Sequence, residues 1–301
     1  MLTVTLLGCG GTRPLPHRAL SVCAVQYNGA VVLLDCGEGT QVAAQRAGIS
    51  LVKIGTVLLT HYHGDHLFGL PGLLQTMAGL GRTTPLLLAG PPGLAAVWQA
   101  VHQLAGPTPF AVQLHELDGC AGEFQAAGLT VEAFPCEHRV PCCGYALSLR
   151  RAPKFDPVKA RALGIPPQRW RALQRGETVC GVSPSQVLGP PRRGLRVVYG
   201  TDTRPCDALR LAARGADLLC MDATYASDED LVKAQQYGHA TCREAGLLAA
   251  QAGTRRLWLT HYSASVEDPA EGLAAAQEKF PEAEAGYDGL TCTLQFDKEL
   301  L

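Results

Sequence analysis

The sequence predicts an α/β fold, in which short buried strands alternate with helices along the chain. Residues 56–60 and 86–89 are runs of leucine and β-branched residues, as in buried strands, and residues 70–77 and 92–104 follow them with helical character. Hydrophobic residues make up 47% of the 301 residues and charged residues 18%, which is enough apolar material for a large core. We therefore expect residues 1–301 to form a single domain that carries one inserted segment.

The first elements follow from local signals in the N-terminal part of the chain. Residues 3–7 predict a strand, and the glycine-rich residues 8–14 favour a tight loop that lines a site over a phosphate-binding loop, because no Gly-Lys-Ser/Thr follows. Residues 21–27 and 30–35 flank Asn28-Gly29, which is a strong two-residue hairpin signal. A helix is then expected to begin near Gln41.

Later elements are indicated in the same way. Thr241 predicts the N-cap of a helix over residues 243–252, because Glu244 three residues later completes a capping box. Residues 159–163 and 170–174 are short helical candidates. Further strands are expected at residues 129–134, 197–202, 217–221, 257–262 and 291–296.

Composition and charge exclude several classes of protein. The formal net charge of -1 argues against a uniformly basic nucleic-acid binder. The 12 cysteines are scattered without a Cys-x-x-Cys pair, which favours reduced, mostly buried thiols in a cytoplasmic protein. The N-terminus lacks the basic region of a signal peptide, and no stretch approaches the roughly 18 continuous apolar residues that span a membrane.

The densest chemistry lies directly after the strand at residues 56–60, in His61-x-His63-x-Asp65-His66. Imidazole and carboxylate suit zinc and similar divalent ions, and alternate residues of an extended segment point the same way, so His61 and His63 can share one ion. A turn at Gly64, where glycine tolerates backbone angles closed to other residues, would direct Asp65 and His66 to a second ion. The alternative is a polar loop after a buried strand, but this order of four ligand-type residues favours a two-metal site.

Three more strands are expected to end in a ligand-type residue. These residues are His138, Asp202 and His261. A single histidine at a strand end is more often structural, but the recurrence of the pattern favours one metal centre. Asp222 ends another strand, and His239 precedes the helix at 243–252, so the two also form a candidate acid/base pair.

Residues 150–193 differ from the rest of the chain in charge. They hold ten lysines and arginines against Asp156 and Glu177, a local net charge of +8, and seven prolines. We expect an inserted arm that projects from the domain and clamps a polyanion, with a flat tryptophan among the arginines for stacking. A merely soluble basic loop is the alternative. The candidate substrate-binding residues are Lys154, Arg169, Trp170, Arg171 and Arg175.

Taken together, these motifs resemble the metallo-β-lactamase superfamily, which carries the same ligand residues in the same order. More narrowly, residues 60–74, 34–41 and 200–203 resemble the signatures of the ribonuclease Z family of tRNA 3′-end endonucleases. The basic segment falls where that family carries its tRNA-gripping arm, and Gly164-Ile165-Pro166-Pro167 matches part of the arm. The resemblance implies a four-layer αββα sandwich, a precursor tRNA substrate, a cytoplasmic location and a homodimer in which one subunit's arm serves the other's site.

The resemblance also implies roles for the site residues. His61, His63 and His138 would hold one zinc ion, Asp65, His66 and His261 the other, and Asp202 would bridge both. Manganese or iron also accept this ligand set. A metal-bound hydroxide would attack the phosphodiester, with Asp65 orienting the water and His239, backed by Asp222, protonating the leaving 3′ oxygen.

Four segments depart from the ribonuclease Z pattern. The departures are Met221-Asp222 for His-Glu, Ala240 for Ser, Gln168-Arg169 for Gly-Pro, and Ser265 for Arg. They keep two alternatives open: a dizinc hydrolase of a small substrate, such as a cyclic phosphodiesterase, an arylsulfatase-like enzyme or a lactonase, and a non-catalytic RNA-binding homologue. The full ligand set argues against the second alternative, and the basic arm argues against the first.

Overall fold

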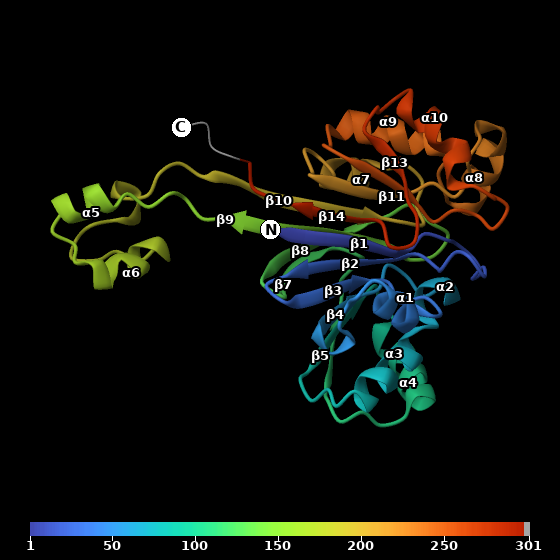
Figure 1. Ribbon diagram of the computed structural model, residues 1–301, viewed down its shortest axis with the longest axis horizontal. Helices are drawn as coiled ribbons and strands as arrows, with labels where there is room; N and C mark the ends of the chain where they lie inside the picture. The colour runs from blue at the N-terminus through green and yellow to red at the C-terminus, as the bar shows by residue number, and fades with distance from the viewer. Residues whose placement is uncertain (298–301) are drawn as a thin grey trace. The chain divides into compact units, whose positions relative to one another are not determined.

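The computed structural model describes residues 1–297, and its contacts divide the chain into two compact units (Figure 1). The first unit comprises Met1–Ser148 and Arg196–Gln295. The second comprises Leu149–Leu195 together with Phe296 and Asp297. Within residues 1–297, every helix is too short or too polar to cross a bilayer.

One mixed sheet is built from the N-terminal half of the chain and one C-terminal strand. Its order is β14-β1-β2-β3-β4-β5-β6, with antiparallel pairing from β14 to β3 and parallel pairing from β3 to β6. The strands are β1 (Leu2–Gly8), β2 (Val22–Tyr27), β3 (Ala30–Leu34), β4 (Ile54–Leu58), β5 (Leu86–Gly90), β6 (Val112–Glu116) and β14 (Thr291–Leu294).

The second mixed sheet has the order β13-β12-β11-β10-β9-β8-β7. Its strands β7, β8 and β9 pair antiparallel, and β10 to β13 pair parallel. The strands are β7 (Gly122–Ala126), β8 (Leu129–Pro135), β9 (Cys143–Arg151), β10 (Arg192–Gly200), β11 (Leu218–Asp222), β12 (Leu257–Thr260) and β13 (Ala283–Ala285).

Helices cover the outer face of each sheet in the first unit, which confirms the expected four-layer αββα sandwich (Figure 1). The first sheet is covered by α1 (Thr40–Arg46), α2 (Gly64–Leu67), α3 (Leu70–Gly79) and α4 (Leu94–Ala105). The second sheet is covered by α7 (Asp207–Ala212), α8 (Leu231–Tyr237), α9 (Cys242–Ala252) and α10 (Leu273–Gln277).

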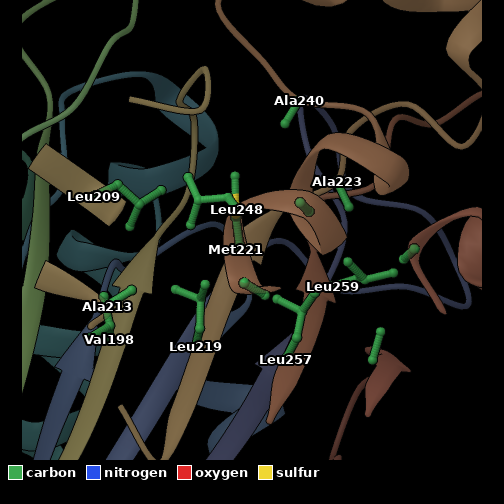
Figure 2. Packing of buried hydrophobic residues seen from close by; sticks show 14 of the residues in the cluster. Val198, Leu209, Ala213, Leu219, Met221, Ala223, Ala240, Leu248, Leu257 and Leu259 are labelled. Atoms are coloured by element: carbon green, nitrogen blue, oxygen red, sulfur yellow. The ribbon is translucent and has the colours of Figure 1, made fainter. Parts of the chain in front are cut away.

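Each helix layer seals a separate hydrophobic core. Leu209 of α7 and Leu248 of α9 pack on Leu219, Met221 and Leu259 of the second sheet (Figure 2). Leu73 and Leu74 of α3 belong to the corresponding core of the first sheet. Burial of each large aliphatic side chain contributes about 1.5–3 kcal/mol, so these cores hold the parallel strands and their carboxyl ends in place.

The two sheets are also joined by a buried polar contact near the ends of their strands. Tyr145 of β9 is fully buried, and its hydroxyl donates a hydrogen bond to the carbonyl of Leu59 at 2.7 Å. Leu59 directly follows β4, immediately before the histidine motif. This bond therefore helps to fix the segment that carries His61 and His63.

The second unit has a small core of its own. The helices α5 (Pro157–Ala162) and α6 (Trp170–Gln174) enclose Ala160, Ile165, Leu173, Val179, Val182 and Val187. Asp156 caps α5 by accepting from the backbone N–H groups of Val158 and Lys159. The second unit therefore has secondary structure and a core of its own.

Several local predictions are confirmed and some elements were not predicted. Asn28 and Gly29 have φ values of 47° and 80°, as a type I′ hairpin turn requires. The capping box of Thr241 and Glu244 is present at the start of α9. The strands β6 and β7 were not predicted, because each is only 5 residues long, mostly exposed and without a continuous apolar run.

We predict that Thr241→Ala destabilises the protein by about 1 kcal/mol, because α9 loses the side chain that accepts from the Glu244 N–H. Denaturant unfolding would measure the change. Thr241→Ser keeps the hydroxyl and is expected to retain most of the stability. Equal stabilities of the alanine variant and the wild type would contradict this role of the cap.

Candidate metal centre

The structure brings four predicted ligands into a first group. His61 and His63 follow β4, His138 follows β8, and Asp202 follows β10; each offers one ligand atom, and these atoms lie within 4.8 Å of one another. His61 Nε2 is 2.9 Å from His63 Nδ1 and 3.7 Å from Asp202 Oδ2. His138 Nε2 is 4.0 Å from the same carboxylate oxygen. The pairing of His61 with His63 agrees with the prediction from their spacing.

A second group shares Asp202 with the first. It contains Asp65 and His66 on α2 and His261 after β12. His66 Nε2 and His261 Nε2 lie 3.1 and 3.0 Å from Asp202 Oδ1, and 3.5 and 3.4 Å from Asp65 Oδ2. Asp202 therefore directs one oxygen toward each group, as a bridging carboxylate would.

The second group has the spacing of a coordination shell. Ligands about 2.0–2.1 Å from a tetrahedral metal stand roughly 3.3 Å from one another, close to the separations between these atoms. In the first group, the His138 side chain is fully buried and its Nε2 has no hydrogen-bond partner among the described residues. A buried unpaired imidazole nitrogen is costly unless something binds it. The donor atoms present thus fit the binding of divalent metal at this cluster.

Hydrogen bonds on the side of each ring that faces away from the ligand groups determine which histidine nitrogen has a lone pair available for a metal. His138 Nδ1 lies 2.9 Å from the Gly238 carbonyl, which can only accept, so Nδ1 carries the proton and Nε2 carries the lone pair. His66 Nδ1 lies 2.8 Å from Asp35 Oδ2 and is set in the same way. Both free nitrogens belong to the ligand groups.

Threonine hydroxyls set the other two rings. Thr60 Oγ1 lies 2.9 Å from Asp35 Oδ1 and gives its only proton to that carboxylate, so it accepts from His61 Nδ1 at 3.0 Å. Thr224 Oγ1 likewise donates to Asp222 Oδ1 at 2.9 Å and accepts from His261 Nδ1 at 3.0 Å. Asp35 therefore orients one histidine of each group, and Asp222 orients His261 from behind.

Asp222 also holds the candidate acid/base histidine. His239 Nδ1 lies 2.8 Å from Asp222 Oδ2, and the His239 ring packs 5.2 Å from that of His138 and 5.3 Å from that of His261. Burial lowers the pKa of His239, but the Asp222 carboxylate outweighs this effect and the pKa is raised overall. Burial by itself would raise the pKa of Asp222, but the positive charge of His239 outweighs burial and lowers this pKa overall.

Three of the residues at strand ends adopt a left-handed backbone. Asp35, Asp202 and His261 have φ values of 66°, 56° and 63°. Such angles cost non-glycine residues of order 1–3 kcal/mol and concentrate at functional sites. Here each angle turns the chain sharply out of its strand while the side chain stays in the buried cluster.

The role of Asp35, Thr60 and Thr224 was missed in the sequence. A signal was available for Asp35, because it also directly follows an apolar strand. An aspartate in an ordinary turn before a glycine such as Gly37 gives the same sequence pattern, however. The threonines carry no signal of their own, since threonine is common in strands.

The reason given for Gly64 was wrong. Gly64 begins α2 and does not have a positive φ. A Cβ at this position would instead overlap the ring of Phe68. The glycine lets that ring approach the backbone closely, and its backbone angles do not call for glycine.

The predicted arm residues all lie in the second unit. Lys154, Arg169, Arg171 and Arg175 are exposed. Trp170 is half-buried: its Nε1 donates to the Ile165 carbonyl at 3.0 Å, and its ring contacts Phe155 and the Arg161 guanidinium. The indole thus contributes to the core of this unit, and its role in base stacking stays a prediction.

Comparison with known proteins agrees with this geometry. Residues 19–130 match the model of the metallo-β-lactamase superfamily, and residues 158–262 match that of a β-lactamase superfamily domain. Human tRNase Z, short form, has a similar structure with a TM-score of 0.70 at 24% identity over 98% of this chain and 100% of that chain. The metallo-β-lactamase fold protein YhfI from Bacillus subtilis aligns with a TM-score of 0.71 at 22% identity over 97% and 98%.

Curated relatives match over the full length. The chain is 41% identical to a ribonuclease Z of Agathobacter rectalis, over 99% of this chain and 100% of the relative. It is 36% identical to a ribonuclease Z of Clostridioides difficile, again over 99% and 100%. The chain belongs to the ribonuclease Z family of the metallo-β-lactamase superfamily.

Proposed function

We propose that the protein is a metal-dependent endoribonuclease that removes 3′ trailers from tRNA precursors. The observation that carries this proposal is the pair of ligand groups joined by Asp202 in a chain with full-length ribonuclease Z relatives. The cytoplasmic location and the homodimer rest on the family resemblance alone.

In this proposal His61, His63 and His138 would hold one ion, Asp65, His66 and His261 would hold the other, and Asp202 would contribute to both. Two zinc ions suit the nitrogen and oxygen donors, and manganese or iron would be accepted too. When bound, such a pair supplies charge stabilisation and lowers the pKa of an attacking water.

The chain itself supplies orientation and proton transfer. Asp65 Oδ2 accepts from the Thr12 backbone N–H at 2.7 Å, which fixes the carboxylate so that its other oxygen can orient the attacking water. Water adds to phosphorus as the bond to the 3′ oxygen breaks; Asp65 accepts the proton that the water loses, and His239 protonates the leaving oxygen. Asp222 holds the His239 ring for this step. The tRNA keeps a 3′ hydroxyl, and the trailer leaves with a 5′ phosphate.

Substrate capture is assigned to the arm at residues 150–193. Its local net charge of +8 and the exposure of Lys154, Arg169, Arg171 and Arg175 support binding to a polyanion. Since the rest of the chain is net acidic, this arm carries the favourable long-range attraction.

The first prediction concerns the reaction itself. Purified protein loaded with zinc is expected to cut a 3′-extended precursor tRNA once, at the base of the trailer. EDTA should abolish the cut and added zinc should restore it, because the metal ions stabilise charge and lower the pKa of the attacking water. Zinc binding without any cut would favour the small-substrate hydrolase instead, and absence of metal binding would favour the non-catalytic homologue.

The second prediction separates metal binding from proton transfer. Asp35→Asn replaces one of the two carboxylate oxygens that accept from His66 and Thr60 by an NH2 donor, so affinity at both metal positions should fall by about 10–100-fold. His239→Ala should keep the metals but lower the single-turnover rate by about 100-fold. Competition with a chromophoric chelator measures the first effect, and quenched-flow cleavage measures the second.

Asp217→Asn is the matched control for Asp35→Asn, because Asp217 is also buried but accepts from Arg196 N–H away from the ligand groups. It should change stability and not metal affinity. Full metal affinity in the Asp35 variant, or an unchanged cleavage rate in the His239 variant, would reject the corresponding role.

The third prediction tests the arm. Joint replacement of Arg169, Arg171 and Arg175 by glutamate should weaken tRNA binding by at least tenfold and flatten its dependence on salt, because phosphate contacts release counterions. Hydrolysis of a small phosphodiester should be spared. The control replaces three exposed cations of the first unit, Arg46, Lys53 and Lys279, by glutamate. Equal loss in both variants, or loss of small-substrate hydrolysis, would refute the clamp.

A further inference from the structure

A small pocket adjoins the second ligand group and has no part in the assignments above. Its volume is about 360 Å³, within the range of small-ligand sites. It lies wholly in the first unit and is lined by Thr12, Pro14, Leu20, Glu38, Gly64, Asp65 and Phe68. Asp65 is thus both a candidate ligand and part of the pocket wall.

Backbone hydrogen bonds fix the walls of this pocket to one another. Cys36 N–H donates to His66 O, and Gly69 N–H donates to Cys36 O, both at 2.9 Å, so the loop that carries Glu38 is joined to the helix before Phe68. Thr12 N–H binds the Asp65 carboxylate on the other side. The pocket is therefore preformed beside the ligand group.

The pocket presents an unusual aromatic surface. Phe68 is 71% exposed, although burial of a phenylalanine is worth several kcal/mol to most folds. Its ring lies over Gly64, whose lack of a Cβ makes room for it. An exposed ring at the edge of the proposed phosphodiester site offers a stacking surface for a base, and such stacking is worth about tenfold or more in affinity.

Glu38 excludes a phosphate from the same pocket. It is exposed, and no described residue pairs with its carboxylate. A free carboxylate repels the nucleic-acid backbone but accepts hydrogen bonds from the edge of a base. Guanine offers two adjacent donors, N1–H and N2–H, whereas uracil offers one N–H between two carbonyl oxygens. The pair Phe68 and Glu38 thus suits a base with adjacent donors.

The position of the pocket selects the nucleotide on the trailer side of the cut. In the proposed reaction the last tRNA nucleotide carries the leaving oxygen, and His239 protonates it. His239 packs on His138 and His261, and neither it nor His138 lines the pocket. The pocket opens instead at Asp65, which orients the water on the opposite side of the phosphorus in an in-line displacement.

We propose that this pocket binds the base of the first trailer nucleotide, stacked on Phe68, with Glu38 accepting from its Watson–Crick edge. This inference rests on the proposed cleavage of precursor tRNA. Binding of this base makes the enzyme selective for the nucleotide directly after the cut, with guanine favoured over uracil.

The test uses the full chain, loaded with zinc, and four precursor tRNAs that differ only in the first trailer nucleotide. The wild type should cut the guanine substrate with a kcat/KM about tenfold above that of the uracil substrate. Glu38→Gln should reduce this ratio to about twofold, because an amide can also pair with uracil. Phe68→Ala should raise KM about tenfold for all four substrates, and Phe68→Tyr should restore it.

Glu123→Gln serves as a matched control, since Glu123 is an exposed carboxylate on β7 outside the pocket. Metal content is measured for every variant, so that damage to the ligand groups is recognised directly. Cutting by the wild type with equal efficiency on all four substrates, or unchanged KM in Phe68→Ala, overturns this inference and leaves the proposed function standing. No cutting by the wild type overturns both.

Discussion

Two buried carboxylates orient three of the five candidate ligand histidines, His61, His66 and His261. Asp35 accepts from the Thr60 backbone and hydroxyl and from His66, while Asp222 accepts from Thr224, His239 and two further backbone N–H groups. Burying an ion is costly unless such bonds replace water, and here the bonds are numerous. Each carboxylate thereby fixes the tautomer of imidazoles that face the ligand groups, so the donor nitrogens are directed inward before any metal arrives.

This arrangement depends on the way strands end in the two sheets. Asp35 follows β3 next to β4, and its carboxylate reaches across to Thr60 just after the end of β4. Asp222 ends β11 next to β12, and it reaches His261 just after the end of β12 through Thr224. Parallel pairing makes this possible because adjacent strands finish at the same edge. The left-handed residues Asp35, Asp202 and His261 sit at these exits, where the hydrogen bonds and packing compensate their strain.

The sequence predicted the seven candidate ligands because four form one dense motif after an apolar run and the other three each follow an apolar run of their own, a pattern that can be recognised without knowledge of packing. The orienting residues escaped this reasoning for physical reasons. Asp35 has the same local signature as a turn aspartate, and the threonines act only through hydroxyl protons whose direction depends on tertiary neighbours. Gly64 and Trp170 show the same limit, because their roles follow from contacts with Phe68, Phe155 and Arg161.

Charge explains why the residues of the catalytic centre and the residues that attract the substrate lie in different parts of the chain. Without metal, the first unit gathers the carboxylates of Asp65, Asp202, Asp35 and Asp222 around one centre, which repels a phosphodiester. Two bound divalent cations would compensate about four negative charges, leaving little surplus to attract RNA over a distance. The attraction has to come from cations placed elsewhere, and residues 150–193 hold a net charge of +8. Metal loading would then decide whether a captured substrate is cut, and the arm whether it is captured at all.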